Sequence, residues 1–530
     1  MNKLLDILFV VLLFCVAGCD DNQANQANQA EKYDESTAKS PAVVDVIHLE
    51  GGDWGYPTPF AHYPRGPGGF KMALIFDSLL ERDEKGLIPW LATAYSIEDK
   101  GLTYRFRIRP GVYWQDGTIL TPEDVAFSLQ YANRYGATWS YVHHALDTIT
   151  VENDSVVVRL REPQAVMLDS IGRTRIIPKH IWEKVDNPKE FTTPDAIIGC
   201  GPYTLSAYSK EHGTYRFTAF DNYWGPKPRV KTIEFVPVSE PILAYENHEL
   251  DMVGVPPDVL PRFQEIKSNR IIRNPAFWGY RLLFNMGRVK VLQDVRIRRA
   301  TALGIDRQEL VDKIARGAAI PGRLSILPPD HVMAAHDLAD LPLDPVQARA
   351  LLAEVGNVPA MELLCSGQEV RIAELLRQRL GEVGIDLSIK TVDGKSRDAR
   401  VRGRDYQLAI IGHGGWGGDA GYLSTHLLGD VFDQNAAPSA SGIDGFEAPE
   451  LAALLSQQAT EIDADKRRES LHQIQHLAIE LVPEIPLFYT AGYTAYRPAT
   501  YDGWMNMYDH HSMQHSKLSY LERSGAAAKR

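Results

Sequence analysis

Cysteine is scarce in this sequence: there are four in 530 residues, and two of them, Cys15 and Cys19, lie within the first nineteen positions. This scarcity excludes a small scaffold held together by disulfides. The remaining two, Cys200 and Cys365, lack the spacing of a metal site. We therefore expect them to be two independent buried thiols.

Long apolar runs and clusters of positive charge are also lacking. The continuous apolar stretch at residues 7–16 has about ten residues, whereas a membrane-spanning helix needs about 20. Acidic residues outnumber basic residues by 68 to 56, which gives a formal net charge of -12. A nucleic-acid partner requires a basic footprint, and no run of lysine and arginine supplies one. The sequence thus argues against a multi-span membrane protein and against nucleic-acid binding.

Recognisable catalytic motifs are missing as well. There is no nucleophile elbow, phosphate-binding loop or H-E-x-x-H zinc motif. Residues 412–417 formally match G-x-G-x-x-G after a strand, but Trp416 and the surrounding glycines are poorly suited to open the helix that a dinucleotide site needs. We therefore expect no enzyme activity and no cofactor.

Short strands alternate with helices along the rest of the chain. Strands are expected at residues 43–49, 104–108, 385–389 and 406–411 from their apolar and alternating patterns. Helices are expected to begin at Thr121-Pro122 and Asp344-Pro345 and to cover 372–383, where Gly384 ends the pattern. This alternation predicts an α/β fold, and the length is sufficient for about three domains.

The amino-terminal segment has the pattern of an export signal. The apolar run ends in Val16-Ala17-Gly18-Cys19, which resembles the lipobox of bacterial lipoproteins. The resemblance implies cleavage of residues 1–18 and lipidation of Cys19, which anchors the mature chain to a membrane. An uncleaved anchor or an ordinary signal peptide is the alternative. Residues 19–40 contain three Asn-Gln-Ala repeats and are expected to form a flexible tether.

Several motifs, in a fixed order, resemble one protein family. They are Trp114-Gln115-Asp116-Gly117-Thr118, Thr121-Pro122-Glu123-Asp124, Ile177-Pro178-Lys179-His180, Leu283-Phe284-Asn285 and Pro483-Glu484-Ile485-Pro486. Together they resemble the signature of the family 5 solute-binding proteins of ABC transporters, the peptide and nickel group. The resemblance extends over about residues 45 to 505.

The resemblance implies a periplasmic-binding-protein-like α/β fold of class II (cluster C), with two lobes joined by a hinge and an extra inserted domain. Lobe I is expected to be discontinuous, lobe III to be continuous, and the ligand to lie between them. The expected boundaries are 41–70, 199–279 and 491–530 for lobe I, 71–198 for inserted domain II, and 280–490 for lobe III.

The resemblance also implies a function. The chain is expected to be a monomer on the extracytoplasmic side of the cell membrane, at the inner membrane if the source is Gram-negative. It would capture a small solute and deliver it to an ABC permease and ATPase complex. An oligopeptide is the favoured cargo; a nickel-type metal chelate, an oligosaccharide, or a role as a ligand sensor without import are the alternatives.

The loop at residues 412–422 holds four of the expected ligand-binding residues, which are His413, Trp416, Asp419 and Tyr422. In peptide-binding members an aspartate in this region takes the amino terminus of the ligand, and Asp419 is the matching residue. A carboxylate facing an ammonium group makes a charge-assisted hydrogen bond, which is the strong kind. A mobile surface loop is the alternative.

Five more residues are expected at the ligand. Nickel-chelate-binding members carry an arginine near the Ile177-Pro178 motif, and this arginine holds a ligand carboxylate. The resemblance therefore points to Arg173 or Arg175. Pairing within domain II is the alternative. Trp54, Tyr56 and Trp278 are aromatic residues in loops or at strand ends, where they could line a concave site or simply belong to the core.

Three histidines near the carboxyl end, His510, His511 and His515, are the weakest candidates for a metal site. We expect His511 and His515 to share a helical face, and the neighbouring methionines would suit a soft metal ion. Packing at the surface or between domains is the favoured interpretation, so no metal is expected.

Overall fold

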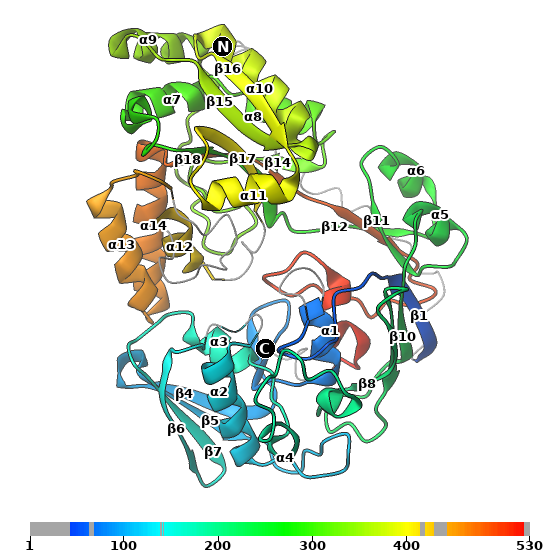
Figure 1. Cartoon of the computed structure of the whole chain (residues 1–530). Coiled ribbons are helices and arrows are strands. Elements are labelled where there is room, and N and C mark those ends of the chain that lie inside the picture. The colour runs from blue at the N-terminus through cyan, green and yellow to red at the C-terminus, as the bar shows by residue number, and fades with distance from the viewer. Residues whose placement is uncertain are drawn as a thin grey trace, which may run out of the picture. The chain divides into compact units, whose positions relative to one another are not determined.

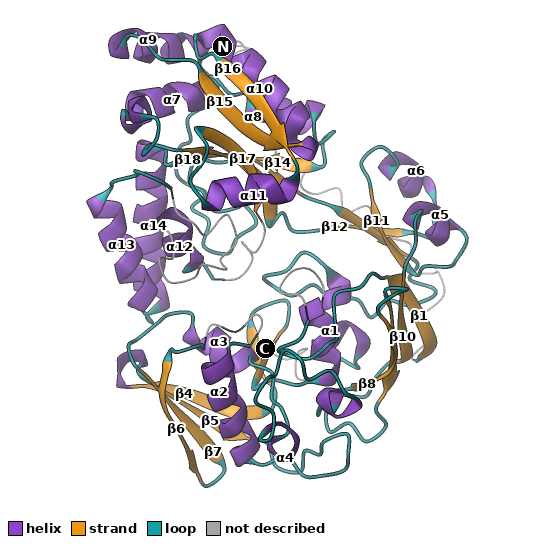
Figure 2. Ribbon diagram, in the orientation of Figure 1, coloured by secondary structure: helices purple, strands orange, loops and turns teal. Residues whose placement is uncertain are grey.

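The computed structural model describes residues 43–62, 68–137, 140, 142–413, 419–428 and 443–523 (Figure 1). All of these belong to one compact unit, Ser40–Arg530. Helices and strands alternate along it, as Figure 2 shows, which confirms the α/β class. None of the helices in the described ranges is long and apolar enough to cross a membrane.

The first sheet has four strands in the order β1-β10-β9-β8. Their bounds are Val44–Glu50 for β1, Tyr203–Ser209 for β8, Thr214–Ala219 for β9 and Val230–Val236 for β10. The first strand runs parallel to β10, and the other pairs are antiparallel. Helix α1 (Gly68–Ile75) packs against this sheet and ends where the chain passes closely at Gly199. A Cβ at Gly199 would lie 2.0 Å from the Ile75 carbonyl oxygen, so only glycine fits there.

A second, antiparallel sheet has the order β4-β5-β7-β6 and is accompanied by helix α2 (Pro122–Tyr135). The strands span Ala92–Glu98, Thr103–Ile108, Leu146–Glu152 and Ser155–Leu160 for β4, β5, β6 and β7. The predicted start of α2 is confirmed. Thr121 precedes Pro122, and the Asp124 carboxylate accepts a hydrogen bond of 2.8 Å from the Thr121 N–H.

The third sheet has six strands in the order β14-β18-β13-β17-β15-β16. The strands are β13 (Trp278–Phe284), β14 (Ala319–Pro321), β15 (Met361–Ser366), β16 (Leu387–Val392), β17 (Leu408–His413) and β18 (Glu484–Thr490). Helices α9 (Pro345–Val355) and α10 (Val370–Val383) confirm the two helices predicted in this region. Gly384 ends α10 with a φ of +98°, which a residue with a side chain rarely adopts.

A small antiparallel sheet has the strand order β11-β19-β12. Its strands are β11 (Met252–Val255), β12 (Arg270–Arg273) and β19 (Tyr493–Tyr496). The chain passes from β12 into β13 and later returns from β18 into β19. The two passages are bonded to each other, because the Asn274 N–H donates to the Gly492 carbonyl at 2.7 Å.

The remaining helices and strands complete the chain. They are β2 (Leu80–Arg82), β3 (Leu87–Pro89), α3 (Met167–Arg173), α4 (Lys179–Trp182), α5 (Pro241–Glu246), α6 (Leu260–Glu265), α7 (Val295–Leu303), α8 (Arg307–Lys313), α11 (Gly394–Arg402), α12 (Tyr422–Leu428), α13 (Pro449–Thr460) and α14 (Ala464–Leu481).

The two cysteines within the described part of the chain are free and buried. Cys200 belongs to the hydrophobic cluster around the first two sheets, and Cys365 to the cluster around the six-stranded sheet. Burial raises the pKa of both thiols. The prediction of two independent buried thiols is confirmed.

Candidate ligand-binding site

An aromatic pair, one ring exposed and one half-buried, marks the start of β13. The Trp278 side chain is 36% exposed, and its ring meets that of Tyr280 edge-on, with centroids 4.7 Å apart. Gly412 on the adjacent strand β17 makes room for it, since a Cβ there would lie 2.5 Å from the Trp278 ring. The structure therefore places Trp278 at the surface, where a ring is available to a ligand.

Asp419 lies near the end of the loop at residues 412–422 and already has a cationic partner. Arg467, on α14, donates to both of its carboxylate oxygens, and the Nη1–Oδ2 distance is 2.5 Å. The Gly421 N–H also donates to Oδ1, at 2.7 Å. The Asp419 side chain is 31% exposed, whereas that of Arg467 is 8% exposed. An ammonium group arriving at Asp419 would thus approach a carboxylate that Arg467 holds from its buried side.

Three other residues of this loop are only partly described. His413 is the last residue of β17 and Tyr422 is the first residue of α12, and their side-chain surroundings are not described. Trp416 and the lipidation candidate Cys19 lie outside the described residues. The ligand contacts expected of His413, Trp416 and Tyr422, and the lipidation expected of Cys19, stay predictions.

The loop after β1 presents the other two aromatic candidates. The Trp54 N–H donates to the Tyr215 hydroxyl at 2.9 Å, and that hydroxyl donates to the Gly55 carbonyl at 2.8 Å. The Tyr56 ring meets the Tyr208 ring edge-on at 5.6 Å. Trp54 and Tyr56 are both half-buried, so each keeps part of its ring open to solvent.

Arg173 is held in a cluster of charged residues. Its guanidinium pairs with Asp169 one turn earlier on α3, and Arg82 pairs with Asp509 close by. Burial opposes the charged form of Arg173, but the charges of Asp169 and Asp509 outweigh it and raise its pKa. Among the described residues, no acceptor bonds its buried Nε. Arg173 thus has one buried N–H without an acceptor in the described ranges, while its Nη2 pairs with Asp169, and its expected ligand contact stays a prediction.

Arg175 belongs to a larger network of buried charged residues. Its Nη1 lies 2.9 Å from Glu81 Oε1, and the buried Lys517 ammonium lies 3.2 Å from the same oxygen. Lys517 also pairs with Asp77, which accepts hydrogen bonds from two indoles. Burial favours the neutral acid, but the two cations lower the pKa of Glu81 to about 2. Arg175 is thus paired with Glu81 within residues 71–198, the kind of pairing considered as its alternative from the sequence, and its expected ligand contact stays a prediction.

The three carboxyl-terminal histidines do not have the predicted geometry. His511 and His515 do not share a helical face, because the only helical turn here is the 3-10 turn Met513–His515. Instead, His510 Nε2 lies 2.7 Å from His515 Nδ1, and Phe70 stacks on the His515 ring at 4.4 Å. In the described ranges, no group of three or more histidine, cysteine or acidic side chains is placed to hold a metal ion.

This histidine pair predicts a dependence of stability on pH. Burial, together with nearby positive charges, lowers the pKa of both His510 and His515 well below the usual value. As the pH falls below about 6.5, these histidines therefore take up protons in the unfolded chain before they do so in the folded protein. The free energy of unfolding should thus fall by up to about 1.4 kcal/mol per pH unit for each ring. Urea unfolding of the wild type and of His510→Gln/His515→Gln between pH 7.5 and 5 tests this. The double variant should lose most of the slope; an equal slope in both proteins would contradict it.

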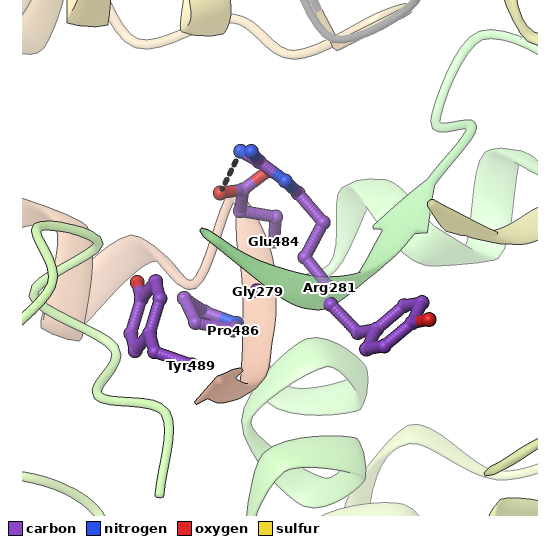
Figure 3. Close-up of a pocket in the computed structure, with 6 residues that line it drawn as sticks. Gly279, Arg281, Glu484, Pro486 and Tyr489 are labelled. Carbon is purple, nitrogen blue, oxygen red and sulfur yellow. Dashed lines mark hydrogen bonds and ion pairs between the residues drawn. The ribbon is translucent and has the colours of Figure 1, made fainter. Parts of the chain in front are cut away.

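A buried triad that sequence reasoning missed joins β13, β18 and α12. The Arg281–Glu484 ion pair, drawn in Figure 3, has an Nη1–Oε1 distance of 3.1 Å. His426 Nε2 lies 2.8 Å from the other oxygen of Glu484, Oε2. Burial would raise the pKa of Glu484, but Arg281 and His426 together lower it. The adjoining recess is also lined by Gly279, Tyr280, Pro486 and Tyr489 and has no room for a water molecule. This is too small for a peptide, so the triad supports the two strands and the helix that follows Asp419.

Known proteins are similar to this chain in sequence and in fold. The family model of the bacterial extracellular solute-binding proteins, family 5, matches residues 86–434. The dipeptide-binding protein of Escherichia coli K12 is 24% identical over 438 residues, which are 75% of this chain and 80% of that protein.

Two solved structures have similar folds. NikA from Brucella suis in complex with Fe(III)-EDTA aligns with a TM-score of 0.75 at 19% identity, over 90% of this chain and 100% of that one. AppA from Bacillus subtilis in complex with a nonapeptide aligns with a TM-score of 0.70 at 17% identity, over 92% and 100%. The periplasmic-binding-protein-like, two-lobe α/β fold is thereby confirmed. With the match over residues 86–434, the chain belongs to the bacterial extracellular solute-binding proteins of family 5.

Proposed function

We propose that this chain captures an oligopeptide outside the cytoplasm and delivers it to an ABC permease and its ATPases. The observation that carries the proposal is family membership together with the cargo of relatives. The Escherichia coli relative is named a dipeptide-binding protein, and the Bacillus subtilis structure contains a nonapeptide. The exposed ring of Trp278 and the partly exposed carboxylate of Asp419 suit a peptide, which offers apolar side chains and an ammonium group.

Capture would proceed by closure of two lobes. We assign residues 41–70, 199–279 and 491–530 to lobe I, 280–490 to lobe III and 71–198 to an inserted domain. The passages at 274–277 and 491–492 lie at the boundaries of these lobes, and their mutual hydrogen bond suits a paired hinge. A ligand that contacts both lobes shifts the equilibrium toward the closed form, which docks on the permease.

The cargo is tested by thermal stabilisation and calorimetry with three sets of probes. The sets are di- to pentapeptides, the nickel–histidine chelate, and short oligosaccharides. Peptide capture predicts that the melting temperature rises with peptides alone, because ligand binding to the folded state stabilises it by mass action. Stabilisation by the chelate or by sugars, with none from peptides, would overturn the assignment.

A metal chelate is the second candidate cargo. One observation favours it: the buried Arg173 Nε has no acceptor among the described residues, and a chelate carboxylate could bond it. The fold neighbour NikA was solved with Fe(III)-EDTA. If the chelate binds, Arg173→Lys should weaken it more than it weakens any peptide, since lysine cannot reproduce the planar fork of donors.

Cys19 is proposed as the membrane anchor of a monomeric mature chain, in which residues 1–18 are removed and 19–40 serve as a tether. Two or more acyl chains hold a protein at a membrane where one does not. Full-length wild type expressed in a bacterium should sediment with membranes, and Cys19→Ala should appear in the soluble extracytoplasmic fraction. Membrane sedimentation of Cys19→Ala equal to that of the wild type would contradict lipidation at this residue.

A further inference from the structure

Lys71 is a buried lysine with no counter-ion among the described residues. It lies on α1 and is 3% exposed. Its ammonium lies 4.2 Å from the centre of the Phe235 ring and 5.1 Å from that of Tyr215. Burial alone lowers its pKa to about 7, and no described carboxylate opposes that shift.

Lys517, the other buried lysine in the described part of the chain, does have counter-ions. It is 2% exposed, and its ammonium contacts the carboxylates of both Asp77 and Glu81. The rings around Lys71 attract a cation through their faces, but they do not replace an oxygen acceptor for its three N–H groups. A methionine of similar length would fill the same space without the cost of burying a charge. The buried amine therefore destabilises the folded protein unless a ligand binds it.

The position of Lys71 connects two groups of expected ligand residues. On one side, Tyr215 is bonded to the loop that carries Trp54 and Tyr56, and a Cβ on Gly68 of α1 would lie 3.1 Å from the Trp54 carbonyl oxygen. Lys71 thus lies beneath the aromatic loop.

On its other side, Lys71 approaches a cluster of basic residues formed by Arg82, Arg173, His510 and His515. The positive charge of Lys71 helps to lower the pKa of His515, and His515 contacts His510. The charges of Arg82 and Arg173 help to lower the pKa of His510. The two carboxylates of this cluster, Asp169 and Asp509, are taken up by Arg173 and Arg82. Nothing acidic among the described neighbours is therefore left over for Lys71.

We propose that Lys71 is the binding partner of a carboxylate on the cargo, either the carboxyl terminus or an acidic side chain of a peptide. The inference rests on the proposed function, since it assigns the acidic part of the same ligand. An anion beside the amine favours its charged form, so capture is coupled to uptake of a proton.

The proton uptake has a defined pH window. With a pKa of about 7 in the free protein, Lys71 is about 90% charged at pH 6 and about 10% charged at pH 8. If the carboxylate restores an ordinary lysine pKa, binding should take up about 0.1 proton at pH 6 and about 0.9 proton at pH 8. Other titratable groups near this region are His510, His515 and Tyr215, together with Asp53, which accepts a hydrogen bond from Tyr215, and His62, which lies close to Gly68 of α1. All of them are present in every variant, so the difference between variants reports Lys71.

The test uses the mature chain and defined tripeptide libraries, made with free carboxyl termini and as terminal amides, each with and without acidic side chains. Peptides that stay bound through gel filtration are quantified by mass spectrometry, and the best binder is titrated by calorimetry in buffers of different ionisation enthalpy. Lys71→Met is compared with Lys231→Met, a control at an exposed lysine. Lys71→Gln serves as a second variant if Lys71→Met folds poorly.

The wild type and Lys231→Met should prefer carboxylate-bearing peptides, and Lys71→Met should bind them about 10- to 100-fold more weakly and lose the proton uptake. Loss of selectivity for the free terminus or for acidic side chains identifies which carboxylate Lys71 binds. Equal binding of acidic and neutral peptides by the wild type, or unchanged binding by Lys71→Met, would overturn the inference and leave peptide capture intact. Capture of no peptide by the wild type would overturn both.

Discussion

Replacing Asp419 with alanine is expected to weaken peptide binding by about 10- to 100-fold. The carboxylate would lose a charge-assisted hydrogen bond to the ligand's ammonium group, which contributes about 1.5–3 kcal/mol. The loss is compounded because the buried Arg467 guanidinium would remain and would repel the arriving ammonium group. Calorimetric titration of a peptide that binds the wild type measures this directly.

Two control variants on α14, the helix that carries Arg467, separate effects on peptide recognition from effects on stability. Asp465, which is 93% exposed and pairs with Arg468, should be replaceable by alanine without effect on affinity. Arg467→Met removes the competing cation and should leave affinity for a free amino terminus equal or higher. Unchanged affinity in Asp419→Ala would remove the amino-terminus role from this residue.

Replacing Lys517 with methionine is expected to destabilise the protein by about 3–5 kcal/mol, the range found when one partner of a buried ion pair is removed. Asp77 is fully buried and Glu81 nearly so, and both would lose the ammonium that lies between them. The network also joins residue 517 to residues near the start of the chain, so its loss should loosen the carboxyl-terminal segment. Urea unfolding gives the free energy.

The exposed pair Lys231–Asp45 supplies the control, since Lys231→Met should change stability by less than about 1 kcal/mol. Adding Asp77→Asn to Lys517→Met should recover part of the loss, because one uncompensated buried charge is removed. A loss in Lys517→Met no larger than in Lys231→Met would show that the buried network contributes little to stability.

Local features of the fold could be predicted from the sequence. The start of α2 depends on Thr121, Pro122 and Asp124, and the end of α10 depends on Gly384; each signal lies within a few residues. Such caps follow from backbone chemistry that neighbouring residues provide. The free, buried state of Cys200 and Cys365 was also predictable, since the two lie 165 positions apart (365 minus 200) and have no metal-type spacing.

The charged partners could not be predicted, because their contacts join residues that are distant in the sequence. Arg467 is 48 positions from Asp419, and Lys517 is 440 positions from Asp77. Lys71 looks like an ordinary helical lysine until the sheet places Phe235 and Tyr215 around it. The histidine prediction was wrong for a related reason: it assumed helical spacing, whereas packing on Phe70 brings His510 and His515 together without a continuous helix.

Native mass spectrometry of the protein purified from its own cell envelope tests the central claim most directly. A peptide-capturing protein should carry a heterogeneous set of added masses that fragment into amino-acid series, and these should disappear after partial unfolding and refolding and return when peptides are supplied. Added masses that match only metal chelates or sugars, or a refolded protein that takes up no peptide, would contradict the account.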